Sequence, residues 1–506
     1  MSIRTQVRNF IVPLIFGVVV AAITAQSVAA NLLFPRDQVL ADLKQTETLL
    51  KRYHPNLYAH RNAKKLRILF KQVRSEVEDW QTLSRTALQV QRMMAAVCDE
   101  HTALNWPAMF KMLGQTSHAI LAAPIILHGE KAFMKSDIEA RNGLTIDRFD
   151  KIPAADVARR IAASLHADGC VGNQPYSSRG LEPIFGLVLA DMVSLGQSIE
   201  IPRVDGEGKI QKTETITRQD ILSFKGLEYE GRVGRISQLN RLGIPSWVGG
   251  DWDGRYSGVP RTIVRSSKDG KIWYVRVPTF LGRKDWQKNL GKEMRKLIAS
   301  KPEVVILDLS ENKGGRVIDA SYLSSFFLKT AHRVAHTIRI KTLRSPKKDG
   351  VVWDRKDADT ANSDMRRQFR RARRGKKLRP LRFRAKSWGN PSFNGKLVVL
   401  VSPSTKSAAT MVTHVLQRKR DVTVVGYQPQ SSVKTTCYGL GGHFALKHTR
   451  IPISLPYACI DRFPAKNRKA TQLVPDIEVS PLDSTGFGYL TDIMTAAVDH
   501  ILASRE

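Results

Sequence analysis

Ser407 stands where the sequence passes from a predicted strand into a predicted helix, a position from which its hydroxyl could act as a nucleophile. The apolar run at 397–402 predicts the strand, a short turn containing proline follows, and small residues open the helix at 407–417. The N-terminus of a helix offers free N–H groups and a positive dipole end, which favour the negative charge that develops on an attacked carbonyl. An ordinary helix-capping serine is the alternative.

Two consecutive glycines, Gly314 and Gly315, follow a second predicted strand at 304–309. Glycines at such a turn let the backbone approach a ligand closely and point N–H groups at it. The pair could therefore form an oxyanion hole for acyl chemistry at Ser407. A plain turn between a strand and a helix is the alternative that these residues leave open.

Together, the two segments resemble the C-terminal processing (tail-specific) serine peptidases. DLSENKGG is similar to the oxyanion strand and turn of that family, and STKSAAT is similar to its nucleophile segment. Three further segments, KRYHPNLYAH, VCDEHTAL and LVPDIEV, are similar to family motifs and occur in family order. The resemblance implies that Ser407 is the nucleophile and that the N–H groups of Gly314, Gly315 and Ala408 bind the oxyanion. It implies no metal or organic cofactor.

The resemblance leaves two candidates for the base that a serine nucleophile needs. Lys434, 27 residues after Ser407, is near the position of the lysine base in the simpler members of the family. Members with a histidine in the helical cap carry it at the position of His101, whose ordinary pKa of about 6.5 needs little adjustment. We place His101 slightly ahead of Lys434.

Several positions depart from the family pattern. Ser310 replaces an arginine, Ala409 and Thr410 follow the nucleophile in place of a small residue and an acid, and Lys469 stands near the place of a supporting glutamate. A catalytically silent member of the fold, which binds peptides or an anionic envelope surface, is therefore the alternative function.

An α/β scaffold is predicted to bring these distant segments together. From about residue 273, apolar strands alternate with helices, which is typical of a largely parallel sheet. The predicted strands are 273–277, 304–309, 397–402 and 422–425, and the other predicted helices are 289–299 and 316–328.

The preceding residues predict a helical cap at 31–117 and a small mixed α/β region at 118–230. Helical spacing covers 37–54, 64–78 and 84–97, and Ser84 is the expected N-cap of the third helix. The mixed region resembles a degenerate form of the family's PDZ-like domain. The peptidase core is then expected at 231–500.

The first thirty residues predict a secretory signal peptide. Arg4 and Arg8 precede an apolar run at 10–25, and cleavage is expected after Ala29 or Ala30. We therefore expect a periplasmic or secreted protein, with an uncleaved anchor as the alternative.

Four cysteines in an exported chain could form disulfides. Cys437 with Cys459 is the favoured pair, because the two flank a predicted pair of strands whose turn lies at 447–450. Four buried thiols, with Cys98 and Cys170 as the other two, are the alternative.

A basic insertion at 341–386 interrupts the core and contains the densest positive charge of a chain whose net charge is +34. Between Arg366 and Lys386 there are twelve Lys or Arg residues and no acid. Such a segment could bind an anionic envelope surface, and a solvated loop is the alternative. Export makes nucleic acid an unexpected partner, so peptides or proteins are the expected substrates.

Overall fold

The structure is a computed structural model that describes the following residues: 32–112, 125–128, 130–134, 143–164, 176–177, 188, 198–217, 237–245, 262–281, 285–340, 352–353, 381–382, 387–429, 431–433, 435–437, 441–456, 458–462, 472–479 and 489–505. The predicted signal peptide, Cys170, Lys434 and most of the basic insertion, including nearly all of Arg366 to Lys386, lie outside them. Within the described part, none of the helices has the length and apolar character needed to span a membrane.

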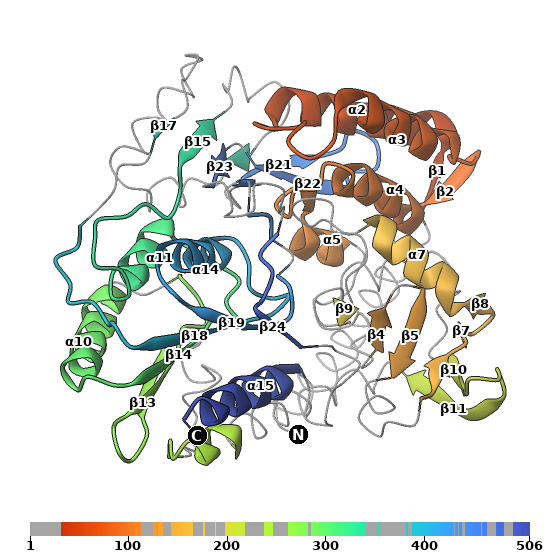
Figure 1. Cartoon of the computed structure of the whole chain (residues 1–506). Helices are drawn as coiled ribbons and strands as arrows, with labels where there is room; N and C mark the ends of the chain where they lie inside the picture. The colour runs from red at the N-terminus through yellow and green to blue at the C-terminus, as the bar shows by residue number, and fades with distance from the viewer. Residues whose placement is uncertain are drawn as a thin grey trace, which may run out of the picture.

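A six-stranded, mainly parallel sheet forms the centre of the molecule, as the alternation of strands and helices predicts (Figure 1). Every neighbouring pair from β13 to β24 is parallel, and β12 adds an antiparallel edge. In spatial order the strands are β12 (Ile263–Ser266), β13 (Ile272–Arg276), β14 (Val304–Asp308), β18 (Lys396–Val401), β19 (Thr423–Gly426) and β24 (Ile477–Glu478).

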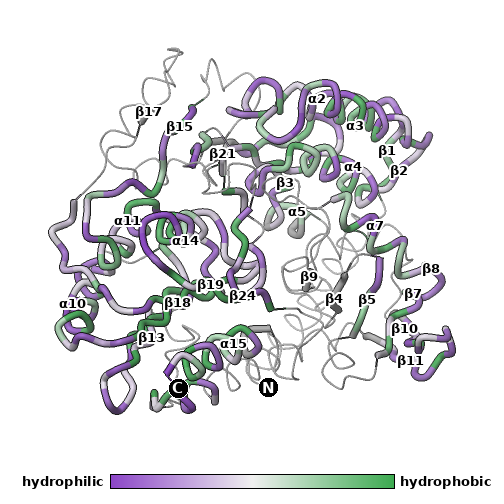
Figure 2. Tube along the Cα trace, viewed as in Figure 1, coloured by the Kyte–Doolittle hydropathy of each residue, from purple (hydrophilic) through white to green (hydrophobic). Residues whose placement is uncertain are grey.

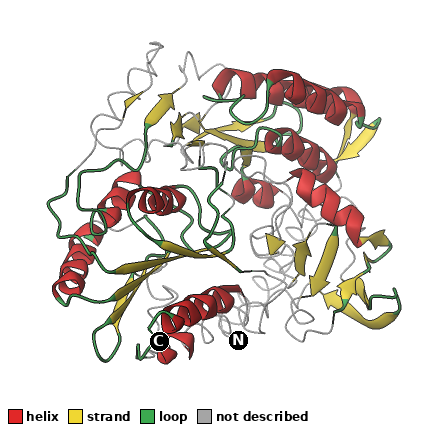
Figure 3. Cartoon of the chain, viewed as in Figure 1, coloured by secondary structure: helices red, strands yellow, loops and turns green. Residues whose placement is uncertain are grey.

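Helices cover both faces of this sheet (Figure 3). One face carries α10 (Trp286–Ala299), α11 (Val317–Ser324) and α14 (Ala408–Lys419), and the other carries α15 (Tyr489–Ala503). Alternate residues of β18 enter two separate cores: Val399 packs in the core that contains Met411 of α14, and Leu400 packs with Met494 of α15. Burial on both faces explains why the inner strands are mostly apolar, as the green stretches of the sheet in Figure 2 show.

A helical region precedes the core and lies at the top of Figure 1. Its third helix begins at Leu83 because the side chain of Thr82 accepts a hydrogen bond from the Arg85 N–H at 3.2 Å. The prediction of Ser84 as the cap is therefore wrong, since Ser84 is a buried residue of the first turn. The helices are α2 (Arg36–Tyr53), α3 (Ala63–Ser75), α4 (Leu83–Ala95) and α5 (Trp106–Met112), and a strand pair, β1 (Leu33–Pro35) and β2 (Trp80–Thr82), joins their ends.

Two further sheets are four-stranded, in the orders β17-β15-β23-β20 and β16-β21-β22-β3, and the second includes β3 of the helical region. β21 and β22 form the predicted hairpin, and the expected disulfide between Cys437 and Cys459 joins β20 to β23 on either side of it. The strands are β3 (Ala103–Leu104), β15 (Thr337–Ile340), β16 (Val352–Trp353), β17 (Leu381–Arg382), β20 (Thr435–Cys437), β21 (Gly441–Ala445), β22 (Pro452–Pro456) and β23 (Ala458–Asp461).

The predicted mixed region contains a sheet in the order β11-β10-β6-β5-β4-β9, with α7 (Ala154–Ser164) beside it. This agrees with a small α/β unit, whereas its likeness to a PDZ domain stays a prediction. The strands are β4 (Ile125–His128), β5 (Lys131–Met134), β6 (Thr145–Ile146), β9 (Tyr176–Ser177), β10 (Ser198–Val204) and β11 (Ile210–Thr217), with a separate pair, β7 (Arg148–Phe149) and β8 (Ile152–Pro153).

Candidate active site

Ser407 lies at the turn that leads from β18 to α14, at the carboxyl edge of the central sheet. It is the N-cap of α14, yet its side chain makes no capping hydrogen bond, so the alternative of an ordinary capping serine does not describe it. Its φ of 51° and ψ of −117° lie in a region that non-glycine residues rarely adopt, at a cost of about 1–3 kcal/mol. A sharp strand–turn–helix of this kind presents a serine hydroxyl above a sheet.

Gly314 and Gly315 reach the same place from the end of β14, which is the parallel neighbour of β18. Gly314 has a φ of +94°, and a Cβ on it would lie only 2.8 Å from the Ser407 Cβ and 3.1 Å from the Ala408 nitrogen. Gly315 has a φ of +132°, and a Cβ there would meet the backbone of Phe280 at 2.6 Å. Only glycine allows this close approach of the two turns.

Asn312 holds the glycine turn in place. Its buried side chain accepts a hydrogen bond from the Gly314 N–H at 2.8 Å and donates one to the Val277 carbonyl at 2.8 Å. Its own carbonyl accepts from the Lys406 N–H at 3.0 Å, which joins the two turns directly. The Gly314 N–H is thus already engaged.

The candidate oxyanion donors that remain are the N–H groups of Gly315 and Ala408. Among the described residues, neither group donates a backbone or side-chain hydrogen bond. Gly315 follows Gly314 in the glycine turn, and Ala408 follows Ser407 in the other turn. The two turns touch, because a Cβ on Gly314 would lie 3.1 Å from the Ala408 nitrogen. Two such N–H groups at adjoining turns could bind one oxyanion, which is the kind of stabilisation that acyl transfer uses.

Ser431 connects Ser407 to the helical region. Its buried hydroxyl oxygen accepts a hydrogen bond from the Ser407 N–H at 3.0 Å, and its hydroxyl lies 3.3 Å from both carboxylate oxygens of Glu100, to which it donates. Glu100 is the residue before His101. The segment that carries the candidate histidine is therefore joined to the backbone of Ser407 through one side chain.

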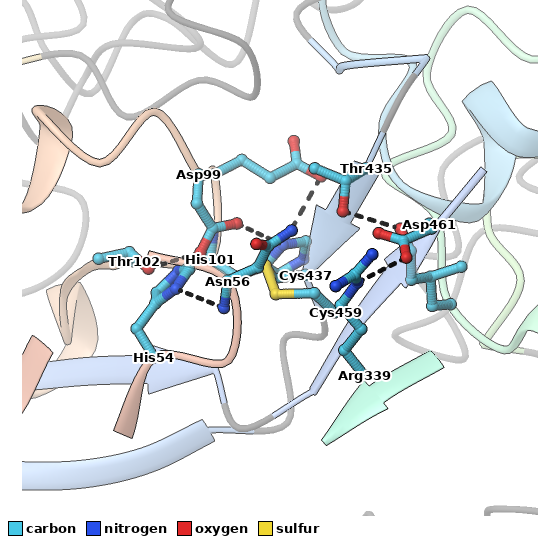
Figure 4. Close-up of a disulfide and its surroundings, with 12 residues drawn as sticks. His54, Asn56, Asp99, His101, Thr102, Arg339, Thr435, Cys437, Cys459 and Asp461 are labelled. Atoms are coloured by element: carbon cyan, nitrogen blue, oxygen red, sulfur yellow. Dashed lines mark hydrogen bonds and ion pairs between the residues drawn. A yellow bond between two sulfur atoms is a disulfide. The ribbon is translucent and has the colours of Figure 1, made fainter. Parts of the chain in front are cut away.

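Asp99 is the hub of the segment that follows α4 (Figure 4). Its buried carboxylate accepts hydrogen bonds from the His101 N–H at 3.2 Å, from the Thr102 hydroxyl, and from His54 Nε2 at 3.2 Å. The His101 ring is partly exposed, and its Nδ1 lies 3.8 Å from both Asp99 Oδ1 and Glu100 Oε1. Two carboxylates thus face one edge of the candidate base.

Burial raises the pKa of the Asp99 carboxyl, but His101 and His54 together lower it by more, through hydrogen bonds and through their charge. The net result is a pKa well below the ordinary value, so Asp99 stays ionised. The Asn56 N–H donates to His54 Nδ1 at 3.2 Å, which assigns the proton of a neutral His54 ring to Nε2, the atom that faces Asp99.

The disulfide between Cys437 and Cys459 lies beside this hub (Figure 4). Within the described residues, His54 and these two cysteines form a group whose potential metal-ligand atoms lie within 4.8 Å of one another. Both sulfurs are joined to each other, so neither offers the thiolate that a metal would need. The cluster in this oxidised form is a packing and hydrogen-bonding unit.

Of the candidate residues, the structure brings Ser407, Ala408, Gly314 and Gly315 together and links the His101 segment to them, while Lys434 lies outside the described residues. Sequence reasoning missed Asn312, Ser431 and Glu100. Asn312 and Glu100 stand inside the family-like motifs and could have been singled out. Ser431 has no local signal, because its role comes from a contact 24 residues away.

Comparison with known proteins matches residues 271–440 to peptidase family S41. This segment contains both glycines and Ser407, and it begins long after His101. Among solved structures, a CPAF mutant has a similar fold, with a TM-score of 0.55 and 13% identity over 92% of this chain and 96% of that one. Mature CPAF complexed with lactacystin gives a TM-score of 0.54 at 13% identity, over 93% and 98%. No curated protein matches by sequence.

Proposed function

We propose, from the premise that the core of this chain is that of a tail-specific serine peptidase of family S41, that the protein is an exported endopeptidase that acts through an acyl-enzyme. One observation carries the proposal: Ser407 is held in a strained conformation against Gly314 while its hydroxyl is not used as a cap. Such strain persists where the surroundings impose it, and it clusters at functional sites. The family implies peptide or protein substrates.

In the proposed mechanism, Ser407 Oγ attacks the carbonyl carbon of a substrate peptide bond while a base takes the hydroxyl proton. The carbonyl oxygen becomes negative, and the N–H groups of Ala408 and Gly315 stabilise it. The C–N bond then breaks, the base gives its proton to the leaving amine, and the acyl group stays on Ser407. A water molecule, deprotonated by the same base, releases the acyl group. Gly314 donates no hydrogen bond to the oxyanion, since its N–H is bonded to Asn312. Its lack of a side chain allows the two turns to approach each other.

We propose His101 as the base, with Nε2 as the atom that takes the proton. The carboxylate oxygens of Asp99 and Glu100 that lie 3.8 Å from Nδ1 would stabilise the positive charge of the imidazolium that forms at that moment. The link from Glu100 through Ser431 to Ser407 supports a place for His101 in the same site. Lys434 is the other candidate, and it would need desolvation to lower its pKa.

The location and organisation are proposed on sequence grounds. The N-terminal apolar run favours export, and a disulfide fits an oxidising compartment. We keep 31–117, 118–230 and 231–500 as the proposed helical cap, PDZ-like region and core, after a signal peptide at 1–30. A tether to an anionic surface through Arg366 to Lys386 stays a prediction.

A fluorophosphonate reagent tests the proposed function, because it labels activated serines. We expect the wild-type protein to be labelled and Ser407→Ala not to be labelled, with thermal midpoints that differ by only a few degrees. Ser404→Ala is the matched control, since Ser404 lies in the same turn and its N–H is bonded to Ser402 Oγ. Labelling of Ser407→Ala would refute the assignment of Ser407 as the nucleophile. An unlabelled wild type would favour the catalytically silent alternative.

A further inference from the structure

A buried arginine, Arg462, contacts Ser407 from a strand pair that lies outside the central sheet. Its guanidinium Nη2 donates a hydrogen bond to the Ser407 carbonyl oxygen at 3.2 Å, and the residue is only 4% exposed. The same oxygen accepts the Met411 N–H at 3.1 Å, in the first turn of α14. A carbonyl oxygen has two lone pairs, so it can accept both bonds.

The Ser407 carbonyl belongs to the same peptide unit as the Ala408 N–H. A peptide bond is planar and trans, so its C=O and N–H point in opposite directions and cannot rotate independently. A charged donor that fixes the carbonyl therefore also aims the N–H on the other side. A positive charge beside the oxygen further polarises the unit and strengthens the N–H as a donor.

The strands on which Arg462 depends are locked by the disulfide. Arg462 follows directly after Asp461, the last residue of β23, which is paired with Thr435 of β20. Cys437 and Cys459 form the disulfide at the other end of this strand pair. Ser431, which accepts the Ser407 N–H, lies four residues before β20, so both contacts to the Ser407 backbone come from one end of the pair.

We infer that Arg462 is a positioning residue that aims the Ala408 N–H at the oxyanion by holding the Ser407 carbonyl. This inference rests on the proposed function, because it assumes acyl chemistry at Ser407. Arg462 acts through the Ser407 carbonyl, an oxygen that takes no part in the bonds made and broken. Its effect should therefore appear in the rate of the chemical step and leave reagent binding unchanged.

Arg420 offers a matched comparison at the other end of the same helix. It is the C-cap residue of α14 and is partly buried, and its guanidinium also donates to backbone carbonyls, among them Phe393 at 2.9 Å. Loss of either arginine removes a charged donor from backbone oxygens near α14. Only Arg462 binds the peptide unit that carries an oxyanion donor.

The test measures the rate constant (kinact) and the binding constant (KI) of fluorophosphonate labelling at a temperature where every variant is folded. Removing an oxyanion donor costs about a hundredfold or more, so misaiming one in Arg462→Gln should lower kinact by roughly tenfold with KI unchanged. Arg462→Lys, which keeps a charged donor, should recover part of that loss and also serves if the Gln variant does not fold. Arg420→Gln should keep the wild-type kinact even where its thermal midpoint falls.

The outcomes separate this inference from the proposed function. If the wild type is labelled and both Arg462 variants keep its kinact, Arg462 is structural and the inference is wrong while the proposed function stands. Equal losses in Arg462→Gln and Arg420→Gln would also overturn it, because they would reflect general damage to α14. A wild type that is not labelled would overturn both.

Discussion

The hydroxyl of Ser407 is available for chemistry because other residues form the hydrogen bonds of its backbone N–H and carbonyl groups. Ser431 accepts its N–H, and Arg462 and Met411 donate to its carbonyl. These bonds over-determine a conformation that would otherwise relax, which is the condition under which strain persists at a site. The hydroxyl oxygen of a capping serine would instead accept a hydrogen bond from an N–H group in the first turn of the helix.

The lowered pKa of a single residue, Asp99, predicts how the stability of the protein depends on pH. Its folded pKa lies below its unfolded value of about 3.9, so its contribution to stability is fully present above that value and is lost as pH falls through the folded pKa. Asp99→Asn should therefore lower the free energy of unfolding most at neutral pH, with a gap to wild type that narrows below about pH 4. Urea unfolding between about pH 3 and 7 measures this gap.

The exposed carboxylate Asp499, which pairs with Arg241 at the surface, provides the control variant Asp499→Asn. Exposed ion pairs contribute little, so this variant should stay close to wild type across the range. A gap for Asp99→Asn that is the same size at both ends of the range would contradict the depressed pKa.

At the scale of elements, the site depends on two turns that follow adjacent parallel strands. β14 leads to the glycine turn and β18 leads to Ser407, and parallel neighbours bring their carboxyl ends to one edge. β19 comes next in the sheet, and the loop after it carries Ser431. The turns after three consecutive strands thus carry the glycine pair, Ser407 and the residue that links them to the helical region.

Gly314→Ala tests the contact between these turns. The new Cβ would lie 2.8 Å from the Ser407 Cβ, so we expect fluorophosphonate labelling to slow by more than about tenfold as the oxyanion geometry shifts. Gly270→Ala is the control, because Gly270 also has a positive φ (+71°) but no atom within 4 Å of the added Cβ. Gly270→Ala should lose about 1 kcal/mol of stability because of its positive φ, and Gly314→Ala should lose more, because its Cβ would also lie 2.9 Å from the Lys406 carbonyl oxygen. Equal labelling rates would refute a functional role for the close approach.

The sequence predicted elements better than contacts. The run at 304–309 is apolar apart from Asp308, the run at 397–401 is wholly apolar, and glycine or proline turns follow them, so the parallel sheet and the position of Ser407 could be predicted. Ser431 and Arg462 could not, because each reaches Ser407 from another part of the sequence and neither follows a periodic pattern. The cap of α4 was misplaced because Thr82 and Ser84 are both good capping residues, and only the backbone at Thr82 is extended.

At the scale of the whole molecule, the site combines a core and a helical region that are far apart in sequence. β3 of the helical region pairs with β22, and buried Asp42 of α2 accepts hydrogen bonds from the N–H groups of His448 and Thr449. These contacts attach the helical region to the hairpin enclosed by the disulfide (Figure 1). The histidine segment is thereby held beside the strands that carry Arg462.

The most direct test of Ser407 as an acyl-accepting nucleophile is a burst experiment with p-nitrophenyl acetate, followed by mass spectrometry of the quenched protein. Accumulation of an acyl-enzyme predicts a burst of p-nitrophenol close to one equivalent per chain. The acetyl group should map to the peptide that contains Ser407, and Ser407→Ala should show no burst. An acetyl group found on another residue, or a burst that Ser407→Ala retains, would contradict the assignment.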